Sequence, residues 1–500
     1  MLGLFRAALG GVLLYDLARR FPDASLLWSS EGVLRAETLR RAPQAGFQIS
    51  FLLGVSSASM VKLAFVGLGL VFALYAVGLF TRAVQILALL GYASLNARNL
   101  FFEDGGTGCV ILLLGWTLLL PLADRFSVDA LRRDAKLSRI SDRVRARTSA
   151  RQPLFTLAAL AVLLQAAIIY WLNAAHKTGA TWRHGDAVHL VLWQHRVNTP
   201  LALWLAAHEP SWLSPLLTWL TKRTELLLPL LLLWPTHPSQ TRAVAFVLAL
   251  LLHGGIALCL TLGPFSYAMI CLVWLTLPGE VLDAVALRAS RRRGWEWARR
   301  RARVVRALRR RLYASRSAPL VVLPQERRKR LIALRELLLA GMLIVETTNV
   351  LASNRGIPKP LQLDQPTWLL AYKLPLRAIQ SWSMFAPDAP RDDGTLVVDA
   401  LTIGGRHVDP FTGAAPDYEQ VRRGLVPHSI ALSDYFFAMR SRQSSRYRRD
   451  LSRYLKTYRA PGSQERLRSA EVWWVSYLAP PRGTTQPGPL KKELLWRLKL

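Results

Sequence analysis

The apolar residues of this chain come in long blocks, unlike the short amphipathic stripes that are typical of soluble helices. Four blocks are each about 18 to 20 residues long, which is the length that an α-helix needs to cross the hydrocarbon core of a bilayer. They are Val61 to Phe80, Leu154 to Leu172, Ala243 to Leu262 and Leu331 to Val350. This pattern predicts a polytopic integral membrane protein.

Weaker apolar blocks raise the predicted number of spans to nine. They cover residues 2–18, 61–80, 82–97, 107–123, 154–174, 213–235, 242–262, 264–285 and 331–351. The first block contains Arg6 and Asp16, and no clear small-residue cleavage site follows it, so we interpret it as a retained helix. The expected fold class is an all-α membrane bundle of about nine transmembrane helices with a small C-terminal α+β domain.

After Ala352 the apolar blocks end, and residues 352–500 have the turn chemistry of a small folded domain. A strand from Thr395 to Ile403, the turn Gly404-Gly405 and a strand from Arg406 to Val408 predict a β-hairpin. The remaining predicted elements are a helix from Ser433 to Tyr458, a strand from Val472 to Leu478, and a loose end marked by Pro480, Pro481, Pro487 and Pro489. The chain is therefore divided into a membrane domain (1–285, eight spans), a basic loop (286–330), a ninth span (331–351) and this tail domain (352–500).

The distribution of positive charge predicts the orientation. The net charge is +33, and two loops are the most basic: residues 124–152 carry nine Lys or Arg, and residues 288–330 carry seventeen. Positively charged loops stay in the cytoplasm. The two loops are separated by four spans, an even number, so both can be cytoplasmic. We expect a cytoplasmic N-terminus and an extracytoplasmic tail domain.

The same arginines allow two interpretations of the stretch from Trp295 to Leu312. Trp297, Val304 and Leu308 share one helical face, which is typical of a helix lying on an anionic bilayer surface. The alternative is a solvated basic loop. Nucleic acid is not an expected partner, because the basic residues lie between apolar spans and are explained by topology.

Several familiar chemistries have no support in the sequence. Cys109, Cys259 and Cys271 lie in predicted spans as small packing residues, and no metal-binding spacing of Cys or His is present. There is no P-loop, nucleophile elbow, zinc-peptidase motif or dinucleotide fingerprint. No metal site is therefore predicted.

In this topology four polar clusters fall on the outer side. They are residues 31–33, residues 98–106 with Arg98, Asn99 and the Glu103 to Gly106 turn, residues 176–185 with His176, Lys177 and Trp182, and residues 382–387. Their convergence predicts one site. We expect the outer ends of the third and fifth spans to pack together and to bring Arg98 close to Lys177.

Individual residues in these clusters have two interpretations each. A desolvated Lys177 next to His176 and Trp182 is a candidate base or nucleophile, and otherwise a snorkelling anchor whose ammonium reaches the headgroups. Asp104 is a candidate binding residue or the cap of the following helix. Glu225 and His253 lie inside spans, where ionisable groups face a partner, a cavity or a substrate path.

Five stretches together resemble the HTTM family, the transmembrane domain shared by vitamin K-dependent gamma-glutamyl carboxylases and many bacterial relatives. They are LFRAALGGVLLYDLARR with WSSEGVL, GLFTRAVQILALLGYASLNARNLFFEDGGTG, PLADRFSVDALRR, AAHKTGATWRHGDAVHLVL and HGGIALCLTLGPFSYAMI. The stretch SWSMFAPDAPRDDGTLVVDALTIGGRHVDPF resembles the extracytoplasmic domain of long bacterial members. The resemblance implies the inner membrane of a bacterium.

In the carboxylases the corresponding lysine deprotonates reduced vitamin K, assisted by a histidine in an Asn-Asn-His motif. The resemblance places that lysine at Lys177, whereas the histidine motif reads Asn96-Ala97-Arg98-Asn99 here. Another branch of the family matures a secreted peptide toxin. The resemblance therefore implies an enzyme or maturation factor acting on a quinone, a lipid or a secreted peptide, with a reduced quinone as the implied cofactor.

In this hypothesis Lys177 is the base, with His176 beside it. Arg98 and Asn99 orient an anionic or carbonyl group, and Glu225 and His253 line the intramembrane cavity. The alternative is a non-enzymatic membrane module whose tail binds a partner and whose arginine loops hold anionic lipids.

Overall fold

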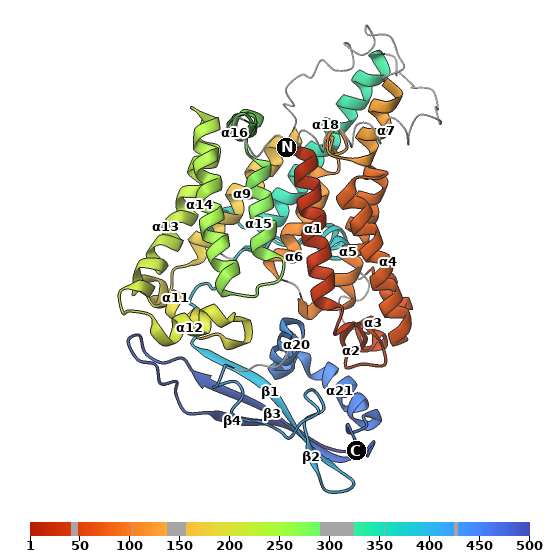
Figure 1. The fold of residues 1–500 in the computed structure, drawn as a ribbon, viewed down its shortest axis with the longest axis vertical. Helices are drawn as coiled ribbons and strands as arrows, with labels where there is room; N and C mark the ends of the chain where they lie inside the picture. The colour runs from red at the N-terminus through yellow and green to blue at the C-terminus, as the bar shows by residue number, and fades with distance from the viewer. Residues whose placement is uncertain (42–48, 103, 138–156, 291–324, 355, 425–428) are drawn as a thin grey trace.

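The computed structural model describes residues 1–500 except 42–48, 103, 138–156, 291–324, 355 and 425–428 (Figure 1). Most of the two basic loops falls in these gaps. The predicted interfacial helix at Trp295 to Leu312 and the side chain of Glu103 therefore lie outside the described residues.

Long helices stand side by side as a bundle, and a small sheet lies across one end of it (Figure 1). The long helices are α1 (Leu2–Arg20), α4 (Ala58–Val77), α5 (Thr81–Arg98), α6 (Gly105–Thr117), α9 (Leu157–His176), α13 (Leu213–Leu233), α14 (Pro238–Cys259), α15 (Phe265–Leu275), α16 (Gly279–Ser290) and α18 (Gln325–Ser353). The shorter ones are α2 (Ala24–Trp28), α3 (Ala36–Arg40), α7 (Val128–Leu137), α10 (Ala180–Arg183), α11 (Ala187–Leu192), α12 (Pro200–His208) and α19 (Thr367–Leu376). Single 3₁₀ turns occur at Phe51–Gly54, Leu100–Phe102, His195–Val197 and Lys359–Leu361.

The prediction of nine membrane spans needs correction. Within the described ranges three helices, α4, α9 and α14, are long and apolar enough to cross a bilayer, and the bent pair α15 and α16 would make a fourth. The other predicted spans do form helices, but α6 has only 13 residues. Helices α1, α13 and α18 carry several charged side chains each. Some of these charges are neutralised by partners within the bundle, so a helix there can carry charged residues. An apolar block in the sequence therefore does not by itself identify a membrane span.

The bundle has two flanks joined by a central pair. Helices α1, α4 and α5 pack together on one flank, and α9, α13 and α14 pack together on the other. Helices α6 and α15 lie between the flanks, and each contacts both of them. In Figure 1 the N-terminus, α7 and α16 lie at the end of the bundle opposite the C-terminal sheet.

Arg6 joins α1 to α4 at the end of the bundle that is remote from the sheet. Its Nη2 donates to the carbonyl oxygens of Ala76 at 3.1 Å and Phe126 at 2.5 Å. The guanidinium lies against Gly78, which ends α4 in the left-handed conformation with φ of 71°. A Cβ at Gly78 would lie 1.9 Å from Arg6 Nη1. Only glycine meets both requirements, the positive φ and the close contact.

The C-terminal sheet is antiparallel with the order β2-β1-β3-β4. Its strands are β1 (Asp392–Thr402), β2 (His407–Val408), β3 (Leu467–Leu478) and β4 (Lys491–Lys499). The predicted hairpin is confirmed by the pairing of Ala400 with Val408, and the predicted strand from Val472 to Leu478 is the second half of β3. Strand β4 replaces the predicted loose end, and its pairing with β3 was not foreseen.

The single helix predicted from Ser433 to Tyr458 is two helices, α20 (Ile430–Arg440) and α21 (Ser445–Thr457). The break allows both helices to pack on the bundle as well as on the sheet. Asp450 of α21 is fully buried and accepts hydrogen bonds from the backbone N–H of Arg35 at 3.0 Å and the hydroxyl of Thr38 at 2.8 Å. The tail domain is thus bonded directly to the α3 region at the end of the bundle that faces the sheet.

Candidate functional site

Lys177 lies immediately after α9 and turns into the protein. Its side chain is buried, with 3% of the residue exposed, and Nζ donates to both carboxylate oxygens of Glu225 at 2.5 and 2.6 Å. Glu225 belongs to α13 and is 5% exposed. A snorkelling lysine keeps its ammonium in the headgroup region. The anchor interpretation of Lys177 is therefore not supported.

The packing of α9 against α13 places this pair. Asn173 lies one helical turn before Lys177, so both side chains reach the same face of α13. The amide Nδ2 of Asn173 donates to Glu225 Oε1 at 2.6 Å. Glu225 thus receives hydrogen bonds from two residues of the α9 end. The role of Asn173 was missed in the sequence, where its position four residues before Lys177 was the available signal.

Trp182 covers the other side of the lysine amine. Lys177 Nζ lies 4.5 Å from the centre of the Trp182 ring, a distance at which the aromatic face attracts a cation. The ring is held by its own Nε1, which donates to the carbonyl oxygen of Phe385 at 2.8 Å. The amine therefore has a carboxylate on one side and an indole on the other.

The segment from Trp382 to Asp388 fixes this arrangement from outside. The N–H of Met384 donates to Asn173 Oδ1 at 3.0 Å, and the N–H of Gly179 donates to the carbonyl oxygen of Pro387 at 2.9 Å. A Cβ on Gly179 would lie 2.1 Å from the Asp388 carboxyl carbon, so this position requires glycine. The predicted convergence of residues 176–185 with residues 382–387 is confirmed.

A buried polar cluster anchors the start of that segment. Gln380 exchanges hydrogen bonds with Gln165 of α9 at 2.9 Å and donates to Glu346 of α18 at 2.8 Å. Trp382 Nε1 donates to Gln380 Oε1 at 2.8 Å, and its backbone N–H donates to Asn354. Residues 367–382 were predicted as part of the tail domain. They are instead packed against the helices of the bundle.

Burial lowers the pKa of Lys177 below the ordinary value of a lysine, while the neighbouring Glu225 carboxylate opposes that shift. Desolvation destabilises the charged amine, and the carboxylate stabilises it. Lys222, whose Nζ donates to the Lys177 carbonyl oxygen at 2.8 Å, adds a second positive charge nearby and also lowers the pKa. The resulting amine releases its proton more readily than a solvated lysine.

His253 of α14 packs against Tyr170 of α9, with ring centroids 5.8 Å apart. Its Nε2 is 2.8 Å from the Tyr170 hydroxyl of α9. Its Nδ1 is buried and has no hydrogen-bond partner among the described residues. Glu225, Lys177 and Trp182 are thus the predicted site residues that contact one another, while His253 is joined to α9 through Tyr170.

His176 faces a different neighbour. Its Nδ1 lies 2.6 Å from the Leu172 carbonyl oxygen and its Nε2 accepts from the N–H of Gly356 at 2.8 Å, so both ring nitrogens are engaged. These bonds fix the neutral tautomer that carries its proton on Nδ1. His176 joins the end of α9 to the chain that follows α18.

The remaining predicted site residues lie elsewhere. Arg98 Nη2 donates to the Leu34 carbonyl oxygen at 2.8 Å, and Asn99 Nδ2 donates to that of Leu27 at 3.1 Å. Arg98 belongs to α5, which packs on α4, α6 and α19, whereas α9, the helix that precedes Lys177, packs mainly on α13. The expected approach of Arg98 to Lys177 is therefore wrong.

Asp104 caps a helix. Its Oδ1 accepts from the N–H of Thr107 at 2.6 Å, and the Thr107 hydroxyl bonds back to the Asp104 backbone. This reciprocal pair is a capping box at the start of α6. The capping interpretation of Asp104 is confirmed.

A second buried charge cluster lies on the other flank and was missed as a unit. Asp16 of α1 bonds Arg19 at 2.7 Å, Arg20 at 2.6 Å and the hydroxyl of Tyr92 at 2.8 Å. Arg20 Nη1 donates in turn to Asn96 Oδ1 at 2.9 Å. The available signal was the spacing of Asp16 from Arg19 and Arg20, three and four residues along one helix.

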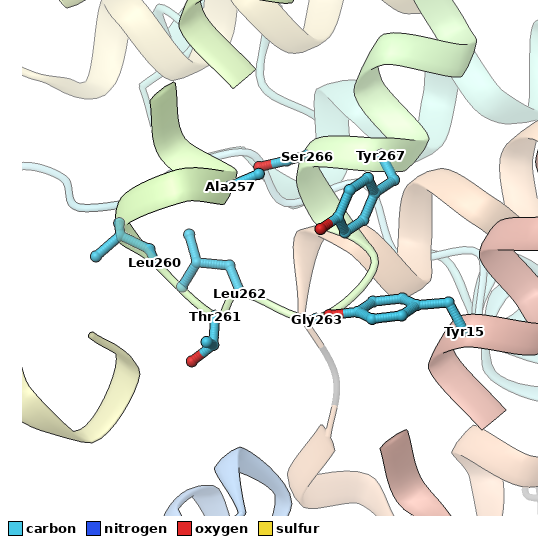
Figure 2. Close-up of a pocket in the computed structure, with 8 residues that line it drawn as sticks. All are labelled: Tyr15, Ala257, Leu260, Thr261, Leu262, Gly263, Ser266 and Tyr267. Atoms are coloured by element: carbon cyan, nitrogen blue, oxygen red, sulfur yellow. The ribbon is translucent and has the colours of Figure 1, made fainter. Parts of the chain in front are cut away.

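A cavity of about 170 Å³ opens beside this second cluster (Figure 2). It is lined by Tyr15 of α1, Ala257 of α14, the loop residues Leu260, Thr261, Leu262 and Gly263, and Ser266 and Tyr267 of α15. None of these was a predicted site residue. Within the described ranges, no group of three His, Cys, Asp or Glu side chains could hold a metal ion.

The Lys177 pair gives a stability prediction. Glu225→Gln leaves a buried amine without its counter-charge, so we expect the free energy of unfolding to fall by about 3 to 5 kcal/mol. The apolar double variant Lys177→Met with Glu225→Leu should recover most of that loss. Glu326→Gln, which removes the acid of an exposed pair with Lys329, is the control and should cost less than about 1 kcal/mol. Unfolding in detergent measures all three, and a Glu225→Gln variant as stable as the control would contradict a charged buried pair.

Comparison with known proteins gives the family. A family model of the HTTM domain matches residues 1–280. No curated protein and no solved structure matches the chain. The matched region runs from α1 to the start of α16 and includes Lys177, Glu225 and His253. Because it covers more than half of the 500 residues, the chain belongs to the HTTM family.

Proposed function

We propose that this HTTM protein is a membrane-embedded enzyme that performs acid–base chemistry, with Lys177 as the proton acceptor and Glu225 as the group that controls its charge. The observation that carries the proposal is the buried bidentate pair itself, with Lys177 Nζ 2.5 and 2.6 Å from the Glu225 oxygens. A base must be able to lose and regain its proton at ambient pH. Burial and Lys222 favour loss of the proton, and Glu225 favours its return.

Stability alone does not account for such a pair. Removing two charges from water costs several kcal/mol per ion, and apolar substitutes are often neutral or stabilising. Three further groups hold the pair in one geometry, namely Asn173 on the carboxylate, Trp182 on the amine, and the 382–388 segment behind both. This fixed setting is what proton transfer requires, since the catalytic groups must be positioned by their surroundings.

The residues present do not fit a reduced quinone as the acid that Lys177 deprotonates. The stretch that would supply an assisting histidine, Asn96 to Asn99, lies on the opposite flank, where Asn96 bonds Arg20. The substrate classes that remain under this proposal are a lipid or a secreted peptide reaching the site from the outer face.

The second candidate function is a non-enzymatic membrane module whose C-terminal domain binds a partner. The observation in its favour is that the Lys177 amine is already satisfied by Glu225. In that case the pair only locks α9 to α13. An enzyme requires the proton of Lys177 to be exchangeable, whereas a module requires only a cation at this position.

Arginine at position 177 separates these functions. Lys177→Arg keeps a cation next to Glu225, but a guanidinium stays protonated at accessible pH and cannot act as a base. We expect Lys177→Arg, like Lys177→Ala, to lose at least about 100-fold in activity, the scale of general-base catalysis. Complementation of a deletion strain by well-expressed variants measures this, with Lys329→Arg at an exposed pair as the control.

An exchanged pair completes that test. Lys177→Glu with Glu225→Lys retains both charges and should restore stability lost in either single variant. It moves the amine to α13, so it should not restore function. Full function in Lys177→Arg or in the exchanged pair would mean that the lysine is structural.

We further propose a bacterial inner-membrane location with the N-terminus and both arginine-rich loops in the cytoplasm and the C-terminal domain outside. Support comes from the arrangement in Figure 1, where α7 and α16, which adjoin those loops, lie at the end of the bundle remote from the sheet. Positive charge is retained on the cytoplasmic side. The loop arginines would bind anionic lipids there.

Cysteine labelling tests this orientation in a background without the three native cysteines. With a membrane-impermeant maleimide on intact cells, Ile403→Cys next to the β1–β2 turn should be labelled. Arg288→Cys in α16 should be labelled only after permeabilisation. Both positions are exposed in the structure. Labelling of both sites under the same condition would rule out the proposed topology.

A further inference from the structure

We infer that the cavity between α1, α14 and α15 binds the neutral, hydroxyl-bearing head of a membrane lipid, of the size of a glycerol unit. None of its eight lining residues belongs to the Lys177 cluster. The inference therefore does not depend on the proposed enzymatic function. Figure 2 shows the lining side chains arranged around the loop that joins α14 to α15.

Ser266 is the first reason to expect a ligand. It is 3% exposed, lines the cavity and makes no hydrogen bond with any described residue. In Figure 2 its hydroxyl oxygen points toward Ala257, across the cavity. A hydroxyl that can reach only the cavity can form its hydrogen bonds only with what occupies that cavity. Tyr15 and Tyr267 bring two further hydroxyl groups to the cavity wall, whereas Thr261 Oγ1 donates to the Val197 carbonyl oxygen at 2.9 Å.

The charges behind the cavity favour a neutral head. Arg19 lies against the cavity wall, because a Cβ on Gly263 would be 2.6 Å from its Nη2. Its guanidinium already bonds Asp16 through Nε at 3.1 Å and Nη2 at 2.7 Å. Asp16 also pairs with Arg20, and the Asp104 carboxylate lies behind the same wall, since a Cβ on Gly263 would be 3.0 Å from its Oδ2. Two carboxylates thus balance the two guanidiniums, which does not call for an anionic ligand. No Asp, Glu, Lys or Arg lines the cavity itself.

Position and size favour a lipid head. Ala257 lies in the last turn of α14, a candidate membrane span that ends at Cys259, so the cavity is at headgroup depth. Tyr15 and Tyr267 pack edge to face at 5.1 Å and are 42% and 40% exposed, forming a wall toward the surface. At roughly 30 Å³ per water-sized group, the cavity holds about five or six such groups. A glycerol unit fits this volume.

The test uses a monoacylglycerol that carries a photoreactive diazirine near its head, with the full-length protein in phosphatidylcholine nanodiscs. We expect labelling of the peptides that contain Tyr15 and residues 257–267, and competition by unlabelled monooleoylglycerol. A diazirine probe with the same chain but no glycerol head should not label these peptides. Equal labelling by the headless probe, or no labelling here by the glycerol probe, would overturn the inference.

Two variants locate the contact. Ala257→Phe fills the cavity and should reduce labelling at least about fivefold, whereas Leu258→Phe at the next, 65% exposed position should not. Ser266→Ala should weaken competition about fivefold, as expected for one hydrogen bond. It should leave thermal stability unchanged, because the Ser266 hydroxyl bonds to none of the residues that the structure describes. Unchanged labelling in Ala257→Phe together with unchanged competition in Ser266→Ala would show that the lipid does not occupy this cavity.

Discussion

The structure depends on the pairing of buried charges within a largely apolar helix bundle. A charge that leaves water must find a counter-charge or hydrogen bonds within the protein, because an uncompensated buried charge is strongly destabilising. Asp16 meets this requirement for Arg19 and Arg20 on one flank, and Glu225 meets it for Lys177 on the other. Each cluster ties together the helices of its own flank. The relative positions of α1 and α5, and of α9 and α13, follow from them.

The segment from Gln380 to Asp388 connects this constraint to function. At its start, Gln380 bonds to Gln165 and Glu346 inside the bundle. Its later residues lie next to the residues that surround the Lys177 amine. Its backbone bonds to Gly179, Asn173 and Trp182 hold the ion pair in place. A chain segment that follows the matched HTTM region therefore completes the setting of Lys177. The site requires the C-terminal part of the chain as well as the family domain.

The sequence predicted local features better than spatial ones. The β-hairpin at Gly404-Gly405, the cap at Asp104 and the helices at the apolar blocks follow from turn chemistry, capping and hydrophobic length, which are local properties. The approach of residues 382–387 to Lys177 was foreseen because topology and resemblance pointed to the same side.

The failures concern partners that are distant in the chain. Arg98 was expected near Lys177 because both were predicted to lie at the outer ends of helices. The order of helices in a bundle is, however, set by side-chain packing that hydrophobic periodicity does not encode. The prediction of nine membrane spans was wrong for a related reason. Buried ion pairs such as that of Asp16 allow a helix with charged residues to pack inside the bundle without being an apolar membrane span. The cavity beside Gly263 depends on three separate helices and leaves no signature in any one of them.

The central claim is that Lys177 is a buried amine whose proton is held by Glu225 and is nevertheless exchangeable. Nuclear magnetic resonance of protein with isotope-labelled lysine, titrated with pH, measures this directly, with the signal assigned by its loss in Lys177→Arg. We expect the pKa of Lys177 to lie below those of the exposed lysines, because burial lowers it. It should fall further in Glu225→Gln, where the attraction that opposes burial is removed. A Lys177 signal that titrates together with the exposed lysines, in the wild type and in Glu225→Gln alike, would contradict the account.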